Sequence, residues 1–216
     1  MKKAVSMAVL ASAVLFSSVF SGGLQTVGAV DKNAKAHAAY EELLTDGDKV
    51  EKITGHSGDR LNEFKFALLD MNEDGVEEMV LTPDDGYHVE VFSYVKEDVK
   101  MVGSGYAGGQ EYYPNKHLYF SHTTHMGADE YYAYRFNRKK MKLLAQKVGS
   151  MYFNVVTGEE KSDEEQDSFE PYEYKVKGKV VSEKKYEAYI GKLLKGAKEE
   201  KPKLVKNSAK NRKKYL

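Results

Sequence analysis

The amino-acid sequence predicts an α+β fold: an antiparallel, meander-like β-sheet with an N-terminal and a C-terminal helix packed on it. Residues 64–176 contain a series of short segments in which apolar and polar residues alternate, as they do in half-buried strands. The links between these segments are too short for the crossover that a parallel strand requires. The chain also has 16 tyrosines and 9 phenylalanines, which suit a pleated, half-exposed sheet.

The beginning of the chain has the pattern of a secretion signal, which we assign to residues 1–29. Lys2 and Lys3 precede an apolar stretch, and small residues ending in Ala29 follow it. The stretch is short for a membrane span, so we expect cleavage, a mature chain that begins near Val30, and no membrane span after it. An uncleaved N-terminal anchor is the alternative. The expected location is extracellular.

The mature chain is expected to form a single secreted domain over residues 30–200, followed by a basic C-terminal tail over residues 201–216. The chain has no cysteine, so a hydrophobic core must hold it together without disulfides or thiolate metal sites. Basic and acidic residues are equal in number, 33 each, which gives no general attraction to nucleic acid. We expect a monomer or a weakly associating chain.

Two helices are expected at the ends of the domain. Apolar and small residues recur at nearly helical spacing over residues 33–53, and Gly47 is expected to weaken or break this helix. Ser182 begins a second helix that runs to about Lys195 and has an apolar face. The basic segment after it forms either a loose tail or a short docked helix.

Strand candidates fill the region between the helices. Residues 103–109 contain four glycines and predict a flexible loop beside a binding face. The expected strands are residues 64–68, 76–81, 87–95, 99–102, 117–122, 130–136, 141–146, 151–156 and 172–176.

A motif between the first two strands predicts a Ca²⁺ site. Its side-chain oxygens come from Asp70, Asn72, Asp74 and Glu78, and the Val76 carbonyl supplies a fifth ligand. Oxygens at alternate positions can converge on a hard cation such as Ca²⁺. We expect a structural ion bound with a dissociation constant on the order of 10⁻⁴ to 10⁻³ M, as in extracellular modules.

This motif is not an EF-hand. Leu81 occupies the position where an EF-hand needs a bidentate Glu, so Glu78 must close the cage instead. The alternative is an acidic β-turn without a metal, because Asn-Glu-Asp-Gly is a good turn sequence in any case.

The motif Asp-x-Asn-x-Asp-Gly-x-x-Glu, with an apolar run on each side, resembles the calcium loops of integrin-type propeller (FG-GAP) repeats. The resemblance implies the same five ligands. The chain has one copy where a propeller needs several, Asn replaces an acid, and Glu replaces Asp at the closing position. The resemblance therefore covers the loop and does not imply a propeller.

Most of the mature chain resembles uncharacterised secreted proteins of anaerobic gram-positive bacteria. The similarity includes the turn His125-Met126-Gly127 and the helix opening Val181-Ser182-Glu183-Lys184-Lys185-Tyr186. It implies an extracellular location and this fold class, and it implies no activity.

Histidines and carboxylates near the middle of the chain leave an enzyme open as the alternative function. Two or three histidines with a carboxylate are the groups that a metal-assisted hydrolase uses. His122 and His125 are three residues apart, which places them on opposite faces of a strand, so surface or turn histidines are the simpler interpretation. The candidate residues are His117, His122, His125, Asp129 and Glu130.

The favoured function is a binding module for an extracellular, cell-surface polymer, a peptide or another protein. Tyrosines gather within residues 103–134 and can form a stacking platform, although ordinary sheet packing also accounts for them. A third class is contact with the anionic cell wall through the lysine-rich tail, for which a solvated tail is the simpler interpretation. The candidate ligand-binding residues are Tyr106, Tyr112, Tyr113, Tyr119 and Tyr132.

Overall fold

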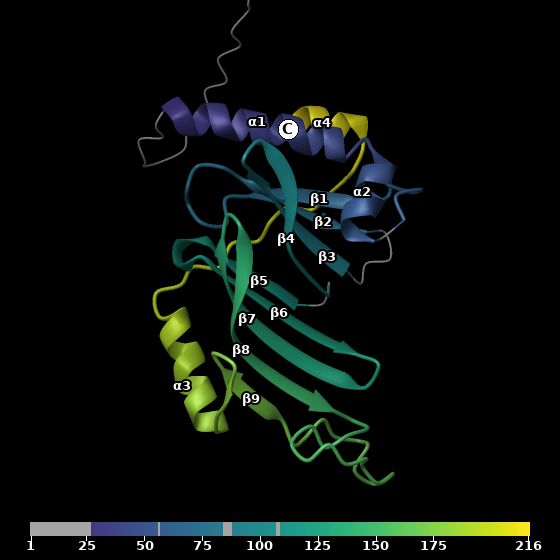
Figure 1. Ribbon diagram of the computed structural model, residues 1–216, viewed down its shortest axis with the longest axis vertical. Helices are drawn as coiled ribbons and strands as arrows, with labels where there is room; N and C mark the ends of the chain where they lie inside the picture. The colour runs from purple at the N-terminus through teal and green to yellow at the C-terminus, as the bar shows by residue number, and fades with distance from the viewer. Residues whose placement is uncertain (1–26, 56, 84–87, 107–108) are drawn as a thin grey trace, which may run out of the picture.

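The computed structural model describes residues 27–55, 57–83, 88–106 and 109–216, and it describes only the backbone of residues 27–31 and Tyr106. Within these residues the strands form two antiparallel sheets, one of five strands and one of six. Figure 1 shows the two sheets one below the other, with helices α1 and α4 above them and α3 beside the lower sheet. The predicted α+β class with antiparallel pairing is confirmed, and the strands are divided between two sheets.

The five-stranded sheet has the order β11-β1-β2-β3-β4, and every neighbouring pair is antiparallel. The short C-terminal strand β11 covers one edge, and β4 forms the other edge. Its strands are β1 (Lys65–Leu69), β2 (Glu78–Thr82), β3 (His88–Val95), β4 (Asp98–Tyr106) and β11 (Val205–Lys206).

The six-stranded sheet is a meander with the order β10-β9-β8-β7-β6-β5. A short 3-10 helix, η1 (Pro114–Lys116), links its first two strands. Its strands are β5 (Gly109–Tyr113), β6 (Leu118–His125), β7 (Ala128–Asn137), β8 (Lys140–Ser150), β9 (Glu173–Val176) and β10 (Lys179–Val180).

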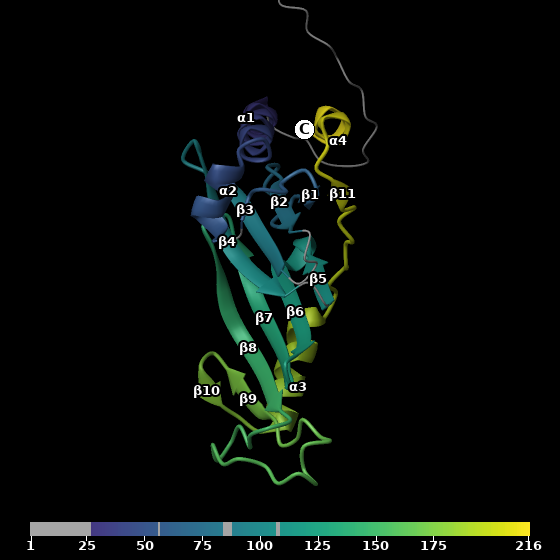
Figure 2. The same ribbon diagram turned by 90° about the vertical axis from the view of Figure 1, so that its right-hand side faces the viewer.

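The first hydrophobic core lies between the five-stranded sheet and the helices α1 (Val27–Leu43) and α2 (Gly47–Thr54). The helix α4 (Ala209–Tyr215) lies beside α1 over the same end of the molecule (Figure 2). The buried residues of this core are Ala36, Tyr40, Leu43, Leu44, Val50, Leu61, Phe64, Phe66, Val76, Met79, Leu81, Phe92 and Val99.

The helix predicted over residues 33–53 is broken near Gly47, as the sequence suggests. Asp46 caps the start of α2 by accepting the Lys49 backbone N–H at 2.9 Å. A Cβ on Gly47 would lie 2.6 Å from the carbonyl oxygen of Gly58, so this site needs glycine to let two backbone segments meet.

A second hydrophobic core lies between the two sheets, and glycines in β4 let the sheets approach each other. A Cβ on Gly103 would overlap the Met141 sulfur, and one on Gly105 would lie 3.1 Å from the Tyr119 hydroxyl. The predicted flexible loop over residues 103–109 is therefore wrong for residues 103–106, which belong to β4. The buried residues of this core are Leu69, Met71, Val80, Val89, Val91, Tyr112, Tyr119 and Phe136.

The helix α3 (Glu183–Leu194) packs against β9 with Ser182 at its N-cap position, as predicted. The rings of Tyr174 and Tyr186 contact each other at a centroid distance of 5.3 Å, and the Tyr174 hydroxyl donates to the Glu183 carboxylate at 2.8 Å. None of the residues of α3 is fully buried, so this helix covers the sheet less closely than α1 does.

The basic C-terminal segment is docked, which answers the choice that the sequence left open. The side chain of Asn207 is buried and donates to the carbonyl oxygens of Leu44 at 2.8 Å and Leu61 at 2.9 Å. Tyr215 and Leu216 pack against the first core. The segment therefore connects the helical layer to the edge of the five-stranded sheet.

The segment between β8 and β9 is organised around a buried lysine. The Lys161 ammonium donates to the carbonyl oxygens of Ser150 and Ser168, each at 2.7 Å, and also to that of Glu170. The strand predicted over residues 151–156 is wrong, because the Asn154 side chain accepts backbone N–H groups and turns the chain there.

Within the described part of the chain, no helix combines the length and the apolar character that crossing a bilayer requires. Residues 1–26 of the predicted secretion signal lie outside the described residues. The backbone of the expected cleavage point, between Ala29 and Val30, belongs to the first turns of α1.

Candidate functional sites

The acidic loop between β1 and β2 folds around the carboxylate of Asp70. That carboxylate accepts the backbone N–H groups of Asp74 at 3.1 Å and Gly75 at 2.8 Å. The Asn72 side-chain oxygen also accepts the Asp74 N–H, at 3.2 Å, and the Asp74 carboxylate accepts the Val76 N–H at 3.1 Å. Gly75 has a φ of 80°, which permits the reversal of the chain. The loop conformation thus gathers the oxygen-bearing side chains of the motif on a short stretch of backbone.

Glu78, the predicted closing ligand, is fully buried at the start of β2. Its carboxyl group accepts the Met71 backbone N–H and the Ser93 hydroxyl, both at 3.1 Å. Burial, together with the nearby carboxylates of Asp74 and Asp70, raises the pKa of Glu78 to about 8. A carboxylate in this position is unfavourable unless a proton or a cation compensates its charge.

Other residues attach this loop to the rest of the protein. Arg138, in the turn between β7 and β8, forms an ion pair with the Asp74 carboxylate. Glu77 accepts a hydrogen bond from His37 of α1 at 2.7 Å, which lowers the pKa of the Glu77 carboxyl. Asn33 accepts the Glu77 backbone N–H at 2.8 Å. The loop is therefore held from both the helical layer and the second sheet.

The ligand atoms that this loop offers are of the type that a hard cation prefers. Asp70, Asn72, Asp74 and Glu78 offer only oxygen, the donor that Ca²⁺ prefers. Among the described residues, however, no group of three or more His, Cys, Asp or Glu side chains is arranged to hold a metal ion. The carboxylates of Asp74 and Glu78 already have protein partners, with which an ion at this loop would compete.

Of the five residues considered for hydrolysis, His122 and Asp129 lie together. His122 Nε2 lies 2.8 Å from Asp129 Oδ1, across the hairpin formed by β6 and β7. Thr124 and Tyr172 also donate their hydroxyls to the Asp129 carboxylate, each at 2.8 Å. Burial raises the pKa of Asp129, but the hydrogen bonds from His122, Thr124 and Tyr172 outweigh it and hold this pKa below its ordinary value.

The other three candidate residues lie elsewhere. His117 follows η1 with a φ of 53°, at the end of β6 that is opposite to the hairpin turn. His125 is exposed at that turn. Glu130 is on the opposite face of β7 from Asp129, and it lines a cleft described below. Period-two alternation therefore separates residues that are neighbours in the sequence.

The surface beside the His122–Asp129 pair is aromatic and basic. The rings of His122 and Tyr131 are stacked at 3.8 Å with an interplanar angle of 6°. The Lys147 ammonium lies 3.9 Å from the centre of the Tyr172 ring and 4.9 Å from that of Tyr131. Lys147 of β8 and Tyr172, which directly precedes β9, come from distant positions in the sequence, so local patterns do not place them beside this pair.

The tyrosines predicted to bind a ligand have different environments. Tyr112 and Tyr119 are buried between the sheets, with their ring centroids 5.3 Å apart, so they are core residues. Tyr113 packs on Phe120 at 5.7 Å. Tyr132 lines the cleft, and the side chain of Tyr106 lies outside the described residues.

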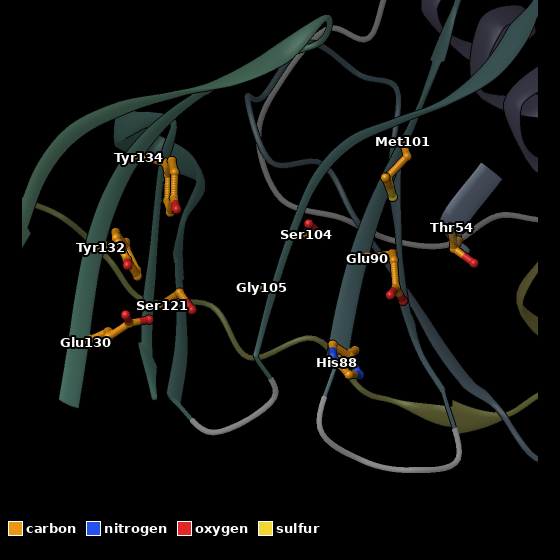
Figure 3. A pocket seen from close by; sticks show the side chains of 10 residues that line it. All are labelled: Thr54, His88, Glu90, Met101, Ser104, Gly105, Ser121, Glu130, Tyr132 and Tyr134. Carbon is orange, nitrogen blue, oxygen red and sulfur yellow. The ribbon is translucent and has the colours of Figure 1, made fainter. Parts of the chain in front are cut away.

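A cleft of about 360 Å³ follows the edge strand β4 (Figure 3). Met101, Ser104 and Gly105 come from β4 itself, which runs between the two groups of side chains that line the cleft. Residues 103–134, the region predicted for binding, supply six of the ten lining residues, but Tyr132 is the one candidate tyrosine among them. The lining residues outside β4 are Thr54 from α2, His88 and Glu90 from β3, Ser121 from β6, and Glu130, Tyr132 and Tyr134 from β7.

The fold and these sites define a two-sheet α+β protein with an acidic loop, an Asp–His pair and a polar cleft along an edge strand. Comparison of the chain with protein-family models, with curated proteins and with solved structures finds no match. The function must therefore be argued from the residues of the chain itself.

Proposed function

We propose that this protein is a secreted binding module whose ligand lies in the cleft along β4. The observation that carries the proposal is the cleft of about 360 Å³ beside an edge strand, inside the region that the sequence favours for binding. Edge strands and hollows lined by aromatic and polar side chains are common features of ligand sites. Gly105 keeps part of the floor open, because any side chain there would approach Ser121 and Tyr119.

The lining favours an extended peptide that carries positive charge. Glu130 contributes a half-buried carboxylate and Glu90 a buried one, and Tyr132 and Tyr134 contribute ring faces and hydroxyls. Carboxylates attract ammonium and guanidinium groups, and tyrosine rings stabilise them further through cation–π contacts. A peptide beside β4 also gains backbone hydrogen bonds from the strand edge.

The test measures binding of an oligolysine peptide and of a neutral peptide of the same length by isothermal titration. The oligolysine is expected to bind, and Glu130→Gln should weaken its binding by about fivefold because it removes one facing charge. Glu187→Gln, an exposed change on α3, is the matched control. Equal binding of both peptides, or equal effects of both variants, would refute this proposal.

We further propose that the loop of Asp70, Asn72, Asp74, Val76 and Glu78 binds one structural Ca²⁺. The burial of Glu78 beside two other carboxylates supports it, because a divalent cation relieves their mutual repulsion. Ca²⁺ at tenfold its dissociation constant would stabilise the fold by about 1.4 kcal/mol.

Thermal unfolding with millimolar Ca²⁺ and with a chelator tests the calcium site. The melting temperature should rise by about 3 °C with Ca²⁺, and Asp70→Asn should remove the rise. Glu73→Gln changes the same charge in the same loop at a position outside the motif, so it should keep the rise. A melting temperature that Ca²⁺ leaves unchanged in the unmodified protein would exclude the site.

The second candidate function is hydrolysis that uses the His122–Asp129 pair. The hydrogen bond of 2.8 Å between these side chains favours it, because a carboxylate orients a histidine for proton transfer. Zinc content of the purified protein and the activity of His122→Ala on ester and peptide substrates test this alternative. Hydrolysis that survives His122→Ala would reject the pair as its source.

Export from the cell is part of both candidate functions, the binding module and the hydrolase. We expect cleavage after Ala29 and recovery of the protein outside the cell. N-terminal sequencing of the protein from culture medium tests this expectation, and an intact first segment in the cell fraction would contradict it.

A further inference from the structure

A basic pocket lies beside the acidic loop, whose Val76 is one of its lining residues. Its volume is about 450 Å³. Lys32 and Lys35 come from α1, Lys96 from the turn between β3 and β4, and Arg138 from the turn between β7 and β8. Glu97 is the one acidic residue among the lining residues, and Asp74 next to the pocket already forms an ion pair with Arg138, so the pocket gathers four cationic side chains near two carboxylates. These cations are distant in the sequence, and the fold brings them together.

The turn that supplies Lys96 has an uncommon conformation for its sequence. Lys96 and Glu97 have φ values of 53° and 64°, the left-handed region that a two-residue hairpin turn requires. Asn-Gly or Asp-Gly would adopt this turn with less strain, at a saving on the order of 1 kcal/mol per residue. Strained backbone often accompanies a functional role, and here it accompanies a lysine that lines a pocket.

We propose that this basic pocket binds a phosphate group. Several lysine and arginine side chains around one hollow match the multiple negative oxygens of phosphate. Gathering like charges costs electrostatic free energy, which a bound dianion recovers. The volume leaves room for a substituent on the phosphate, so the group belongs either to a free phosphate compound or to a phosphodiester polymer.

The pocket is independent of the cleft along β4, since no residue lines both. The pocket adjoins the acidic loop through Val76 and Arg138, but Lys35 and Lys96 carry charge whether or not that loop holds an ion. Phosphate binding in the presence of a chelator therefore tests this site separately from the functions proposed above.

The first experiment titrates the protein with inorganic phosphate in a chelator at low ionic strength and follows binding by isothermal titration. Saturable binding is expected, with an affinity that falls as sodium chloride is added. Lys96→Gln should weaken binding by about fivefold. Lys100→Gln changes an exposed lysine of β4 outside the pocket and should have no effect.

A second pair of variants shows whether Lys96→Gln acts through lost charge or through a changed conformation of the turn between β3 and β4. Lys35→Gln should weaken phosphate binding about as much as Lys96→Gln, and Lys139→Gln, next to Arg138 but outside the pocket, should not. Circular dichroism and thermal unfolding confirm that each variant is folded. No saturable binding by the unmodified protein up to about 50 mM phosphate, or equal binding by pocket and control variants, would overturn the proposal.

The source of the phosphate follows from a third titration with a glycerol phosphate oligomer. Tighter binding per phosphate than inorganic phosphate identifies a polymer ligand that contacts the pocket and its surroundings. Equal or weaker binding identifies a free phosphate compound. Both results require the Lys35 and Lys96 variants to lose affinity, and a result in which they do not would count against the pocket.

Discussion

Arg138 forms an ion pair with Asp74, and this contact links the turn between β7 and β8 to the acidic loop between β1 and β2. It connects the two sheets. It also connects two proposed sites, because Asp74 belongs to the calcium motif and Arg138 lines the basic pocket. A ligand at one site that changes this ion pair must change the affinity of the other site by the same factor in return.

The ion pair predicts that Arg138 competes with Ca²⁺ for Asp74. Arg138→Gln should raise the Ca²⁺ affinity of the loop about threefold to tenfold, because it removes a cation from beside a metal ligand. Isothermal titration with Ca²⁺ measures the change.

Lys139→Gln is the control for this prediction, since it removes the neighbouring charge and leaves the ion pair intact. Arg138→Gln that binds Ca²⁺ more weakly than Lys139→Gln would show that Arg138 supports the loop and does not compete with the ion.

Asn207 is expected to be among the most sensitive polar residues of the fold. Its buried amide donates to the carbonyl oxygens of Leu44 and Leu61, and its own oxygen accepts from Arg212 at 2.7 Å. Asn207→Ala should lower the free energy of unfolding by about 2 to 4 kcal/mol, because it removes the Asn207 donor from the Leu44 carbonyl, one of two donors from the Leu61 carbonyl, and the acceptor of Arg212. Urea denaturation measures this change in the free energy of unfolding. Asn211→Ala is a milder comparison at an exposed hydrogen bond, and an equal loss in both variants would contradict this account.

Lys161 is expected to hold the segment between β8 and β9 in its fold. Lys161→Met should remove the ammonium that three carbonyl oxygens surround, and should expose this segment while the two sheets remain folded. Limited proteolysis and hydrogen exchange over residues 150–172 measure the change. Lys179→Met, at an exposed site on β10, should leave the segment protected from proteolysis and hydrogen exchange. Loss of this protection in both variants would mean that the removed charge, and not the contacts of Lys161, causes the effect.

The Asp129 network predicts how stability depends on pH. The pKa of Asp129 is lower in the folded protein than in the unfolded chain, so its ionised form stabilises the fold above the unfolded pKa of about 3.9. This contribution is lost as the pH falls through the lower, folded pKa. The melting temperature of the unmodified protein should therefore decrease more steeply below about pH 4 than that of Asp129→Asn.

Asp163→Asn, an exposed change, is the control for this pH dependence and should retain the steep decrease. Near pH 7 the Asp129→Asn variant should itself be less stable by about 1 to 3 kcal/mol, because His122, Thr124 and Tyr172 lose a charged acceptor. If the melting temperatures of Asp129→Asn and of the unmodified protein decrease equally steeply below about pH 4, the proposed role of the Asp129 hydrogen bonds is wrong.

The docked C-terminal segment changes how contact with the cell wall must be tested. Deletion of residues 203–216 would remove Asn207, Tyr215 and Leu216 from the core, so it would unfold the helical layer. Replacement of Lys210, Lys213 and Lys214 by Gln removes charge from α4 without removing its core contacts. We expect this triple variant to keep its melting temperature and to be released from cell walls at lower salt, and unchanged release would eliminate the tail as a wall anchor.

Local patterns in the sequence predicted most of the secondary structure. Alternation identified the segments of β1 to β3 and of β6 to β8, and the break near Gly47 and the start of α3 at Ser182 followed from glycine and capping chemistry. The failures also have local causes. Gly103 and Gly105 suggested a loop, yet glycine in β4 serves the close approach of two sheets, and Asn154 turns a segment whose composition resembles a strand.

The candidate sites were predicted less completely, because their parts come from distant segments. The acidic loop is continuous in the sequence, so its residues could be named together and their binding of Ca²⁺ stays a prediction, whereas the cleft needs Glu90 from β3 and Glu130 from β7. Alternation alone predicts that Asp129 and Glu130 face opposite ways. It does not predict that Tyr172 reaches Asp129 or that Lys147 lies over Tyr131.

The sequence by itself determined the α+β class, the antiparallel pairing and the chemistry of the acidic loop, because these depend on residues a few positions apart. The tertiary structure decided that the strands divide into two sheets, that the tail is docked through Asn207, and that Arg138 meets Asp74. Side chains separated by tens of residues meet only through packing, and packing depends on the shape of the whole core and not on any local pattern.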